Sequence, residues 1–271
     1  MPARDSHAAF GALGTQPAPI PASSHVEKVR LALLELERKG CQVDEDVVSA
    51  MSQVDMDAIV VCLEKNRRKE PAWKPSYKRF LNDSRVMHLA QGGYVFENLS
   101  VYMVLTQLLA PALREAAKPR VLDVGCGTGF LTAVLASLVA ERSGHVKAID
   151  IFERQVEHAQ RDLQECLPHL LPLCSFEVCN AWTYEDAEGF DAIAVAAQCE
   201  ELPQNLVRLL KPKGRLVCPL GPVVPIDSER ADRFQPYWMV EVGADGQQIF
   251  SGRAGPLSVN FLPLIPPEPS V

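Results

Sequence analysis

Short apolar segments alternate with longer amphipathic segments through the middle of the chain. Apolar runs rich in β-branched residues predict strands at residues 120–124, 145–150, 175–179, 190–196 and 215–220. Helical spacing of apolar residues predicts the helices between them, at residues 130–140, 153–167 and 203–210. Strands that alternate with helices form a parallel sheet covered by helices. The pattern therefore predicts an α/β fold with a doubly wound, mostly parallel sheet.

The flanking segments follow other patterns. Before the alternation, helical spacing predicts helices at about 24–39, 44–52, 57–63 and 100–113, and Pro111 is expected to kink or end the last one. Residues 73–99 have no clean period, apart from a glycine turn at 91–93 and a weak strand at 94–96. After the alternation, an Asp-Gly turn joins strand-like runs that predict an antiparallel edge hairpin, at 237–242, 249–250 and 257–264.

These elements predict one domain at residues 25–266, between short tails at 1–24 and 267–271. The domain is expected to consist of an N-terminal helical part, a central ligand-binding core and C-terminal strands, at 25–115, 116–222 and 223–266. The first tail is rich in Ala, Pro, Gly and Ser, so we expect it to be disordered. It has neither the apolar core of a signal peptide nor the pattern of a transit peptide, which predicts a cytoplasmic location.

Composition narrows the range of partners. The net charge of −7 argues against a general nucleic-acid-binding protein, which needs a basic face. The basic run at 65–69 is interpreted as a solvated loop. No apolar run reaches the roughly 18 residues that a membrane span needs, so no membrane association is predicted.

The chain has eight cysteines, and none of them forms a Cys-x-x-Cys pair. Cys126, Cys199 and Cys218 fall in apolar segments, which predicts free buried thiols in a reducing compartment. Cys174 and Cys179 would need two further ligands to hold a metal ion. No metal site is therefore predicted.

The first strand of the alternation runs into a glycine-rich turn that a helix follows. This stretch reads Val121-Leu122-Asp123-Val124-Gly125-Cys126-Gly127-Thr128-Gly129. Glycines allow positive φ and close approach of a ligand, and the next helix directs unpaired N–H groups at the turn. A dinucleotide site has Gly-x-Gly-x-x-Gly, whereas the spacing here is Gly-x-Gly-x-Gly. Asp123 would repel a pyrophosphate and attract an ammonium group, which favours S-adenosyl-L-methionine. A turn without any ligand is the remaining alternative.

The ends of the following strands supply further candidates, because ligands lie beyond the carboxyl ends of parallel strands. Asp150 can accept hydrogen bonds from both hydroxyls of a ribose, and it can also cap the next helix. Ile151 or Phe152 can pack on an adenine face, and Asn180 can bond the adenine edge or serve as a turn residue. The residues expected to bind the cofactor are Asp123, Gly125, Cys126, Gly127, Thr128, Gly129, Asp150, Ile151, Asn180, Ala181 and Ala197.

Three further segments extend the pattern beyond a cofactor motif. They are Phe-Asp-Ala-Ile-Ala-Val-Ala-Ala at 190–197, Leu-Leu-Lys-Pro-Lys-Gly-Arg-Leu-Val-Cys-Pro-Leu-Gly-Pro at 209–222 and Phe-Leu-Pro-Leu at 261–264. Together with the glycine turn they resemble the protein-L-isoaspartate O-methyltransferase family of class I S-adenosylmethionine-dependent methyltransferases. The resemblance covers about 26–267. It implies a Rossmann-like methyltransferase fold, S-adenosyl-L-methionine as cofactor, protein or peptide substrates that contain isoaspartyl residues, and a monomer.

The loop on the substrate side departs from the family pattern. Where the family carries Thr-Ile-Ser-x-Pro, this chain has Asn98-Leu99-Ser100-Val101-Tyr102. The resemblance implies that Ser100 is the catalytic residue and that its hydroxyl orients the isoaspartyl carboxylate. A cap of the following helix is the alternative role. Glu97, beside this loop, would repel a carboxylate substrate, and Asn180 stands where the family usually has Asp.

Three functions remain open from the sequence. The first is a protein carboxyl methyltransferase that methylates the α-carboxylate of L-isoaspartyl residues in damaged proteins, which is a repair activity. The second is a methyltransferase of the same family with another acceptor. The third is an adaptor module that holds the cofactor without isoaspartyl activity. The resemblance favours the first.

Overall fold

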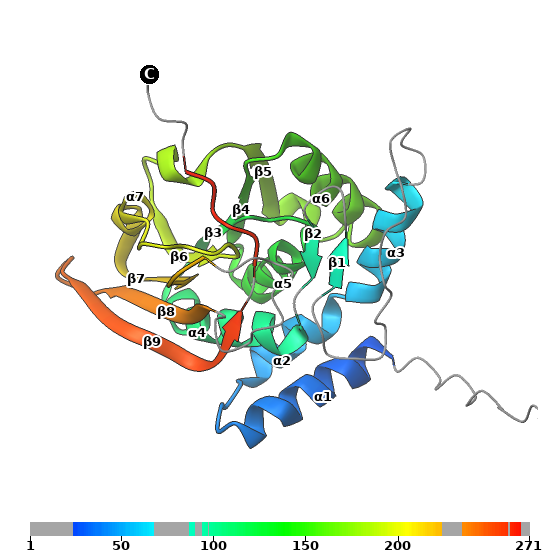
Figure 1. Cartoon of the computed structure of the whole chain (residues 1–271), viewed down its shortest axis with the longest axis horizontal. Coiled ribbons are helices and arrows are strands. Elements are labelled where there is room, and N and C mark those ends of the chain that lie inside the picture. Colours follow the sequence, from blue (N-terminus) through cyan, green and yellow to red (C-terminus); the bar gives the residue numbers. More distant parts are fainter. Residues whose placement is uncertain are drawn as a thin grey trace, which may run out of the picture.

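Seven strands form one sheet through the centre of the protein, as seen in a computed structural model that describes residues 24–67, 87–89, 94–96, 98–223, 235–259 and 261–266 (Figure 1). The strands are β3 (Arg120–Val124), β4 (His145–Asp150), β5 (Cys174–Val178), β6 (Phe190–Val195), β7 (Leu210–Pro219), β8 (Gln235–Val242) and β9 (Gln248–Val259). Their order in the sheet is β5-β4-β3-β6-β7-β8-β9. The strands β3 to β7 pair in parallel, and β8 and β9 form an antiparallel hairpin at the edge. The predicted fold class is confirmed.

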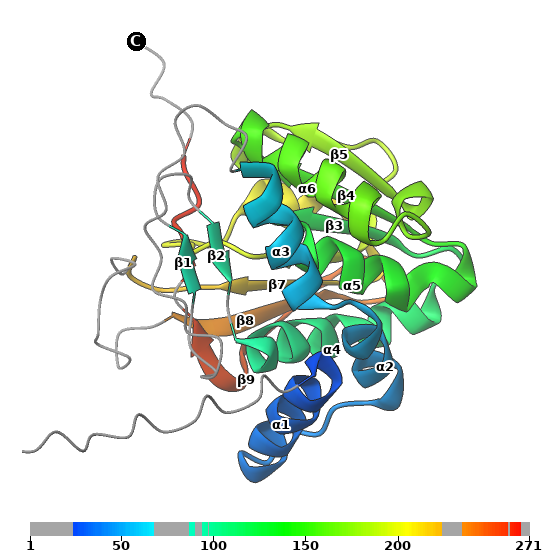
Figure 2. The ribbon, with the colours of Figure 1, turned by 90° about the vertical axis from the view of Figure 1, so that its right-hand side faces the viewer.

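The helices cover the two faces of this sheet unequally. Alternate residues of a strand point to opposite faces, so Val121 and Leu122 belong to different clusters. Val121 lies in a cluster with apolar residues of six helices, α1 (His25–Arg38), α2 (Glu45–Gln53), α3 (Met56–Arg67), α4 (Leu99–Glu115), α5 (Phe130–Val139) and α6 (Glu153–Cys166). Leu122 packs in a cluster with the short helix α7 (Gln204–Arg208). Figure 2 shows α3, α5 and α6 on the same side of the sheet.

The centre of the sheet determines where a ligand can bind. The strand β3 pairs with β4 on one side and with β6 on the other. The chain therefore turns in opposite directions from β3, and a crevice forms there at the carboxyl ends of the strands. The glycine turn follows β3 directly, so it lies at this crevice.

The helix α4 differs from its prediction. It continues for four residues beyond Pro111 and ends at Glu115, so the proline does not end it. Leu109 and Leu113 on either side of the proline are buried, and their packing favours a continuous helix. The carbonyl of Leu108 also accepts a hydrogen bond from Nη1 of Arg215 at 3.2 Å. The N–H that Pro111 lacks would have donated to the carbonyl of Gln107, and the burial of the flanking leucines offsets this loss.

Several other boundaries differ from the sequence prediction. The basic run was expected to be a loop, but residues 65–67 belong to α3, and residues 68 and 69 lie outside the described part. The strand β7 begins earlier than expected, at Leu210, and α7 is correspondingly shorter. The strand β9 is one continuous strand, whereas residues 261–266 form only a single bridge at Pro263. The pair β1 (Met87–Leu89) and β2 (Tyr94–Phe96) includes the weak strand that was predicted. Residues 1–23 and 267–271, predicted as tails, lie outside the described residues.

The cysteines are only partly as predicted. Cys126, Cys199 and Cys218 are free and buried, in agreement with the sequence. Cys62 of α3 and Cys166 of α6 form a disulfide that was not predicted, because nothing in a separation of 104 residues indicates this pair. No group of three or more His, Cys, Asp or Glu side chains suited to a metal ion occurs in the described part of the chain.

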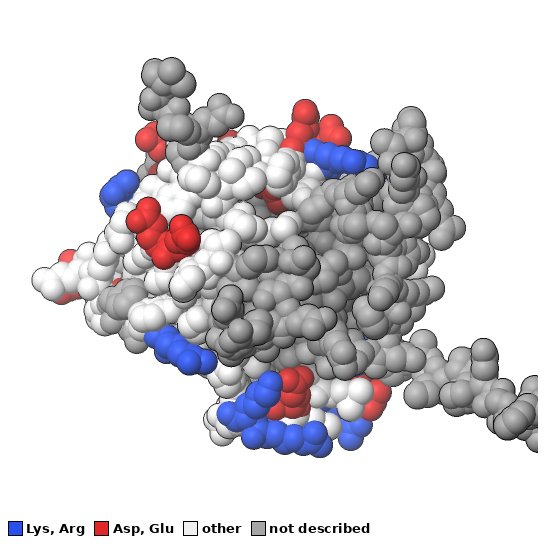
Figure 3. All heavy atoms as spheres, in the orientation of Figure 1, with Lys and Arg blue, Asp and Glu red and all other residues white. Residues whose placement is uncertain are grey.

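The charge of the surface and the length of the apolar helices bear on binding to nucleic acids and membranes. On the face seen in Figure 3, most of the described surface is neither basic nor acidic, and the Lys and Arg side chains gather mainly at the lower edge, over α1, with Asp and Glu side chains beside them. Within the described ranges, no helix is both long and apolar enough to cross a membrane.

Gly129 permits the close packing of α5 on α6. It is the N-cap of α5, with φ of +78°, and a Cβ at this position would lie 2.8 Å from Cδ1 of Leu163 and 3.2 Å from Cβ of Ala159. Gly246 has a similar φ of +79°, but a Cβ there would meet nothing within 4 Å. An added Cβ would strain the backbone at both positions but would cause overpacking only at Gly129.

Gly129→Ala is expected to lower the free energy of unfolding by about 2–6 kcal/mol, since positive φ and overpacking each cost about 1–3 kcal/mol. Gly246→Ala should lower the free energy of unfolding only by the cost of positive φ, about 1–3 kcal/mol. Urea denaturation of the two variants measures the difference. Equal losses would show that packing against α6 contributes nothing at Gly129.

Candidate functional site

A cavity opens at the carboxyl ends of β3, β4, β5 and β6. Its wall consists of segments that follow these four strands, together with side chains from α4 and from the C-terminal segment. The wall includes residues 124–128, 149–152, 179–181, 196–197 and 261–265, with Tyr102, Leu131 and Gln155. Elements far apart in sequence thus meet at the crevice that the strand order creates.

The glycine turn forms the floor of this cavity. Gly125 and Gly127 have φ of +78° and +51°. The backbone N–H groups of Gly125 and Cys126 donate to the carbonyl of Ile149, at 2.9 and 3.1 Å. A Cβ on Gly125 would lie 3.3 Å from the carbonyl oxygen of Ala196, so this glycine allows the turn to pack against the end of β6. A Cβ on Gly127 would meet only the carbonyl oxygen of Gly125, at 3.8 Å, so this glycine lets a ligand come close to the backbone.

Asp150 connects the glycine turn to the segment after β4. Its Oδ2 accepts from the N–H of Gly127 at 3.2 Å, and its Oδ1 accepts from the N–H of Phe152 at 3.1 Å. The residue is 7% exposed. Burial raises the pKa of Asp150, and the backbone donors act in the opposite direction. Each carboxylate oxygen keeps a lone pair that can accept from a ligand hydroxyl.

Asp123 lies beneath the turn and is not part of the wall. It is fully buried, and its Oδ2 accepts from Oγ1 of Thr132 at 2.6 Å. Its Oδ1 has no hydrogen-bond partner among the described residues. Burial raises the pKa of Asp123 from 3.8 to about 7, while the Thr132 hydroxyl lowers it and the charge of Asp150 raises it further. The predicted attraction of an ammonium group would therefore act through the turn and not by contact at the wall.

Asn180 lies on the wall, but its side chain is bonded to the protein. Its Oδ1 accepts from the N–H of Trp182 at 2.9 Å and so caps the 3₁₀ turn η3 (Ala181–Thr183). Its Nδ2 donates to the carbonyl of Ile265 at 3.3 Å. The next residue, Ala181, is fixed by Nδ2 of Asn205, which donates to its carbonyl at 2.5 Å.

Ser100 and Tyr102 point to different parts of the protein. Residues two positions apart on an α-helix differ in direction by about 200°. Ser100 is 1% exposed, and its hydroxyl donates to Oε2 of Glu35 on α1 at 3.4 Å. Tyr102 lies on the cavity wall. The N-cap of α4 is Asn98, whose Oδ1 accepts from the N–H of Ser100 at 3.0 Å, so Ser100 is not the cap.

The structure thus brings most of the predicted site together. The predicted residues on the wall are Gly125, Cys126, Gly127, Thr128, Asp150, Ile151, Asn180, Ala181 and Ala197. Asp123 and Gly129 lie behind the turn, and Ser100 faces α1. The sequence prediction missed Tyr102 and residues 261–265 as wall residues. The apolar run at 261–264 was the only available signal, and its period indicated a strand.

Comparison with known proteins identifies the family. The model of the family "Protein-L-isoaspartate(D-aspartate) O-methyltransferase (PCMT)" matches residues 28–241. The chain belongs to this family. A protein-L-isoaspartate O-methyltransferase of Methanothrix thermoacetophila is 30% identical over 179 residues, which are 66% of this chain and 75% of that protein. Protein-L-isoaspartate O-methyltransferase 2 of Rhodopseudomonas palustris is 30% identical over 193 residues, 70% of this chain and 76% of that protein.

A solved structure agrees in fold. A Plasmodium falciparum chain that bears the same family name, crystallised with S-adenosyl-L-homocysteine, covers 90% of this chain and 99% of its own length. The TM-score is 0.66 at 21% sequence identity. The family is one of S-adenosylmethionine-dependent enzymes, so S-adenosyl-L-methionine is the cofactor of this methyltransferase.

The wall residues fit this cofactor. Gly127 has no side chain, so a ligand can come close to the backbone of the turn. Asp150 would hold the ribose hydroxyls. Ile151 and Phe152 are 37% and 48% exposed at the rim of the cavity, where they would cover the adenine. The glycine turn would hold the methionine part.

Asp150→Ala is expected to weaken the binding of S-adenosyl-L-methionine about 5- to 150-fold, because hydrogen bonds to an ionised group contribute about 1–3 kcal/mol. Calorimetric titration measures the change. Glu157→Ala, an exposed change on α6, is the control and should leave the affinity unaltered. Unchanged binding by the Asp150 variant would contradict its role at the ribose.

Asp123→Asn tests the buried carboxyl. Its folded pKa of about 7 exceeds the ordinary 3.8, so the free energy of unfolding falls as pH rises from 3.8 to about 7 and is level above that. The asparagine variant lacks this fall. Between pH 5 and pH 8, its free energy of unfolding relative to that of the wild type should therefore increase by on the order of 2 kcal/mol. Thr132→Val removes the donor to the carboxyl, raises its folded pKa further and should extend the fall to higher pH. Parallel pH profiles of wild type and Asp123→Asn in urea denaturation would refute the raised pKa.

Proposed function

We propose that the protein transfers the methyl group of S-adenosyl-L-methionine to the α-carboxylate of L-isoaspartyl residues in damaged proteins and peptides. The observation that carries this proposal is the extent of the family match. Residues 28–241 include α1 to α4 and β8 in addition to the cofactor-binding core. A match confined to the core would support a methyltransferase without indicating the acceptor.

The reaction needs little acid–base chemistry. The cofactor supplies a methyl group that its sulfonium already activates, and a carboxylate is already a nucleophile. The protein must hold the two in line and exclude water. Tyr102 contributes to this exclusion, because its ring packs edge-on against Phe130 with centroids 5.0 Å apart and lies 6.5 Å from the ring of Phe261. Phe130 begins α5 directly after the glycine turn, so this aromatic group lies beside the floor of the cavity.

The decisive experiment offers the full-length protein and S-adenosyl-L-methionine to a peptide with one L-isoaspartyl residue. Base-labile methyl incorporation is expected, and the same peptide with L-aspartate is the control. Cofactor binding without methylation of any peptide would support the adaptor alternative. Methylation of another acceptor, with the isoaspartyl peptide left unmodified, would support the second alternative.

The family resemblance proposes Ser100 as the residue that orients the substrate carboxylate, whereas in the structure its buried hydroxyl faces Glu35 on α1. A pair of variants tests which of these two roles Ser100 has. Ser100→Ala is expected to lower kcat on the isoaspartyl peptide sharply, with the affinity for the cofactor nearly unchanged. Glu35→Gln is the matched control, because it weakens the hydrogen bond of the same hydroxyl but leaves the hydroxyl in place. Equal effects of the two changes would assign Ser100 to the packing of α1 on α4.

Three further properties of the protein were predicted from the sequence and form part of this proposal. We infer a monomer, a cytoplasmic location and no binding of nucleic acid. The acidic net charge of −7 supports the last of these. Size-exclusion chromatography with light scattering measures the oligomeric state directly.

A further inference from the structure

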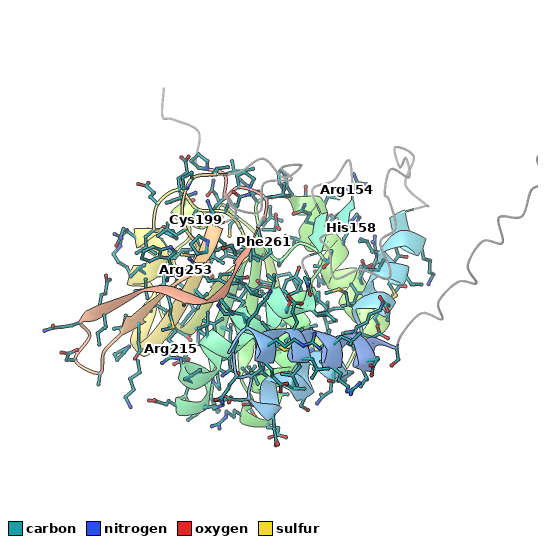
Figure 4. All side chains as sticks on the ribbon, turned by 60° about the horizontal axis from the view of Figure 1, so that its bottom comes forward. Arg154, His158, Cys199, Arg215, Arg253 and Phe261 are labelled. Carbon is teal, nitrogen blue, oxygen red and sulfur yellow. A yellow bond between two sulfur atoms is a disulfide. The ribbon has the colours of Figure 1, made fainter. Side chains whose placement is uncertain are left out.

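The C-terminal segment 261–265 crosses the mouth of the cofactor cavity. After β9 ends at Val259 on the far edge of the sheet, the chain returns across the ends of the central strands, as the red trace in Figure 1 shows. All five residues of the segment contribute to the wall. Phe261 is 3% exposed, so the segment enters the cavity and does not merely lie over it. Figure 4 shows Phe261 beside the loop that carries Cys199.

Gln198, directly after the wall residue Ala197, is the first attachment of this segment. Its backbone N–H donates to the carbonyl of Leu262 at 2.9 Å, and its own carbonyl accepts from the N–H of Leu264 at 2.8 Å. Its side-chain Nε2 donates to the carbonyl of Phe261. The residue is 1% exposed. Water therefore does not replace these hydrogen bonds easily, and the position of the segment follows that of Gln198.

Gln235 on β8 fixes the loop that carries Gln198. Its Oε1 accepts from the N–H of Cys199 at 3.1 Å. Its Nε2 donates to the carbonyls of Gly221 and Pro222, at 2.6 and 3.1 Å. Gln235 is 1% exposed. The loop after β6 is thus connected to the loop after β7 by a buried amide, which makes it a firm support for the segment.

Asn180 is the second attachment, at the other end of the segment. Its Nδ2 donates to the carbonyl of Ile265, and its Oδ1 accepts from the N–H of Trp182 in η3. The bond from Trp182 uses one of the two lone pairs of the amide oxygen, and the bond to Ile265 uses one of the two amide protons. The protein therefore holds this side chain at both ends. The segment is held between two side-chain amides, one after β5 and one after β6.

We propose that Asn180 and Gln198 are positioning residues that fix segment 261–265 as a wall of the cofactor site, and that Asn180 acts through its amide donor. This inference rests on the proposed function only in placing S-adenosyl-L-methionine in this cavity. It does not depend on the methyl acceptor. Its consequence is that the affinity for the cofactor depends on a hydrogen bond that the cofactor itself does not make.

Asn180→Asp separates this role from recognition of adenine by the side chain. A carboxylate can still accept from Trp182, but it cannot donate to Ile265 and would repel that carbonyl. If Asn180 accepted from the adenine amino group, a carboxylate would accept at least as well. Its negative charge would also attract a cationic cofactor. The two roles therefore predict opposite changes in affinity.

The experiment is calorimetric titration of the full-length protein with S-adenosyl-L-methionine. Asn180→Asp is expected to weaken binding about 3- to 10-fold, as the loss of one hydrogen bond predicts. Equal or tighter binding would overturn the proposal. Wild-type binding without methylation of the isoaspartyl peptide would instead overturn the proposed function and leave this test intact.

A second variant tests the mechanism of positioning. Gln198→Met keeps the two backbone hydrogen bonds and removes the side-chain amide, including its donor to Phe261. It should raise the KM for the cofactor about 3- to 10-fold and leave kcat at saturating cofactor within about twofold. Combined with Asn180→Asp, the effect on the cofactor Kd should be smaller than the product of the two single effects, because both act on one segment. Fully multiplicative effects would contradict the shared wall.

Amide hydrogen exchange distinguishes positioning from general destabilisation. In both variants, exchange of the Leu264 N–H should accelerate, while amides in β3 exchange at the wild-type rate. Acceleration throughout the sheet, without a specific change at Leu264, would assign the two residues to overall stability and overturn the proposal. In the wild type, the cofactor should slow exchange at Leu264.

Discussion

Three backbone N–H groups hold the glycine turn against the end of β4, and the rest of the site depends on this attachment. Two of them, from Gly125 and Cys126, share the carbonyl of Ile149, and the third, from Gly127, donates to Asp150. The turn can bend towards β4 because its glycines adopt positive φ. The same bend directs the start of α5 towards the cavity and brings it against α6. One local constraint therefore sets the floor of the cavity, the position of Asp150 and the packing of two helices.

Much of this arrangement could be predicted from the sequence because it is local. Apolar runs and helical spacing predicted the parallel strands of the sheet, and the glycine spacing placed the turn at the crevice. Asp150 was found because it ends a strand adjacent to the turn. Gly129 was assigned to the cofactor, yet its missing Cβ makes room for Leu163 and Ala159, which are remote in sequence. A glycine pattern shows that space is needed and does not show what fills it.

The parts that could not be predicted depend on contacts between distant residues. Ser100 faces α1 because Glu35 lies there, and no periodicity of α4 contains that information. The apolar run at 261–264 looked like an edge strand, but it is a wall of the cavity because Gln198 and Asn180 hold it. The pairing of Cys62 with Cys166 likewise depends on the packing of α3 against α6.

The attachment of segment 261–265 also has a consequence for folding. The Gln198 side chain bonds a carbonyl 63 residues away, and Asn180 bonds one 85 residues away. Contacts of such separation require the closure of long loops, and loop closure of this kind slows folding. The cavity is complete only after this closure. Cofactor affinity therefore requires segment 261–265 to be in place in addition to the parallel core.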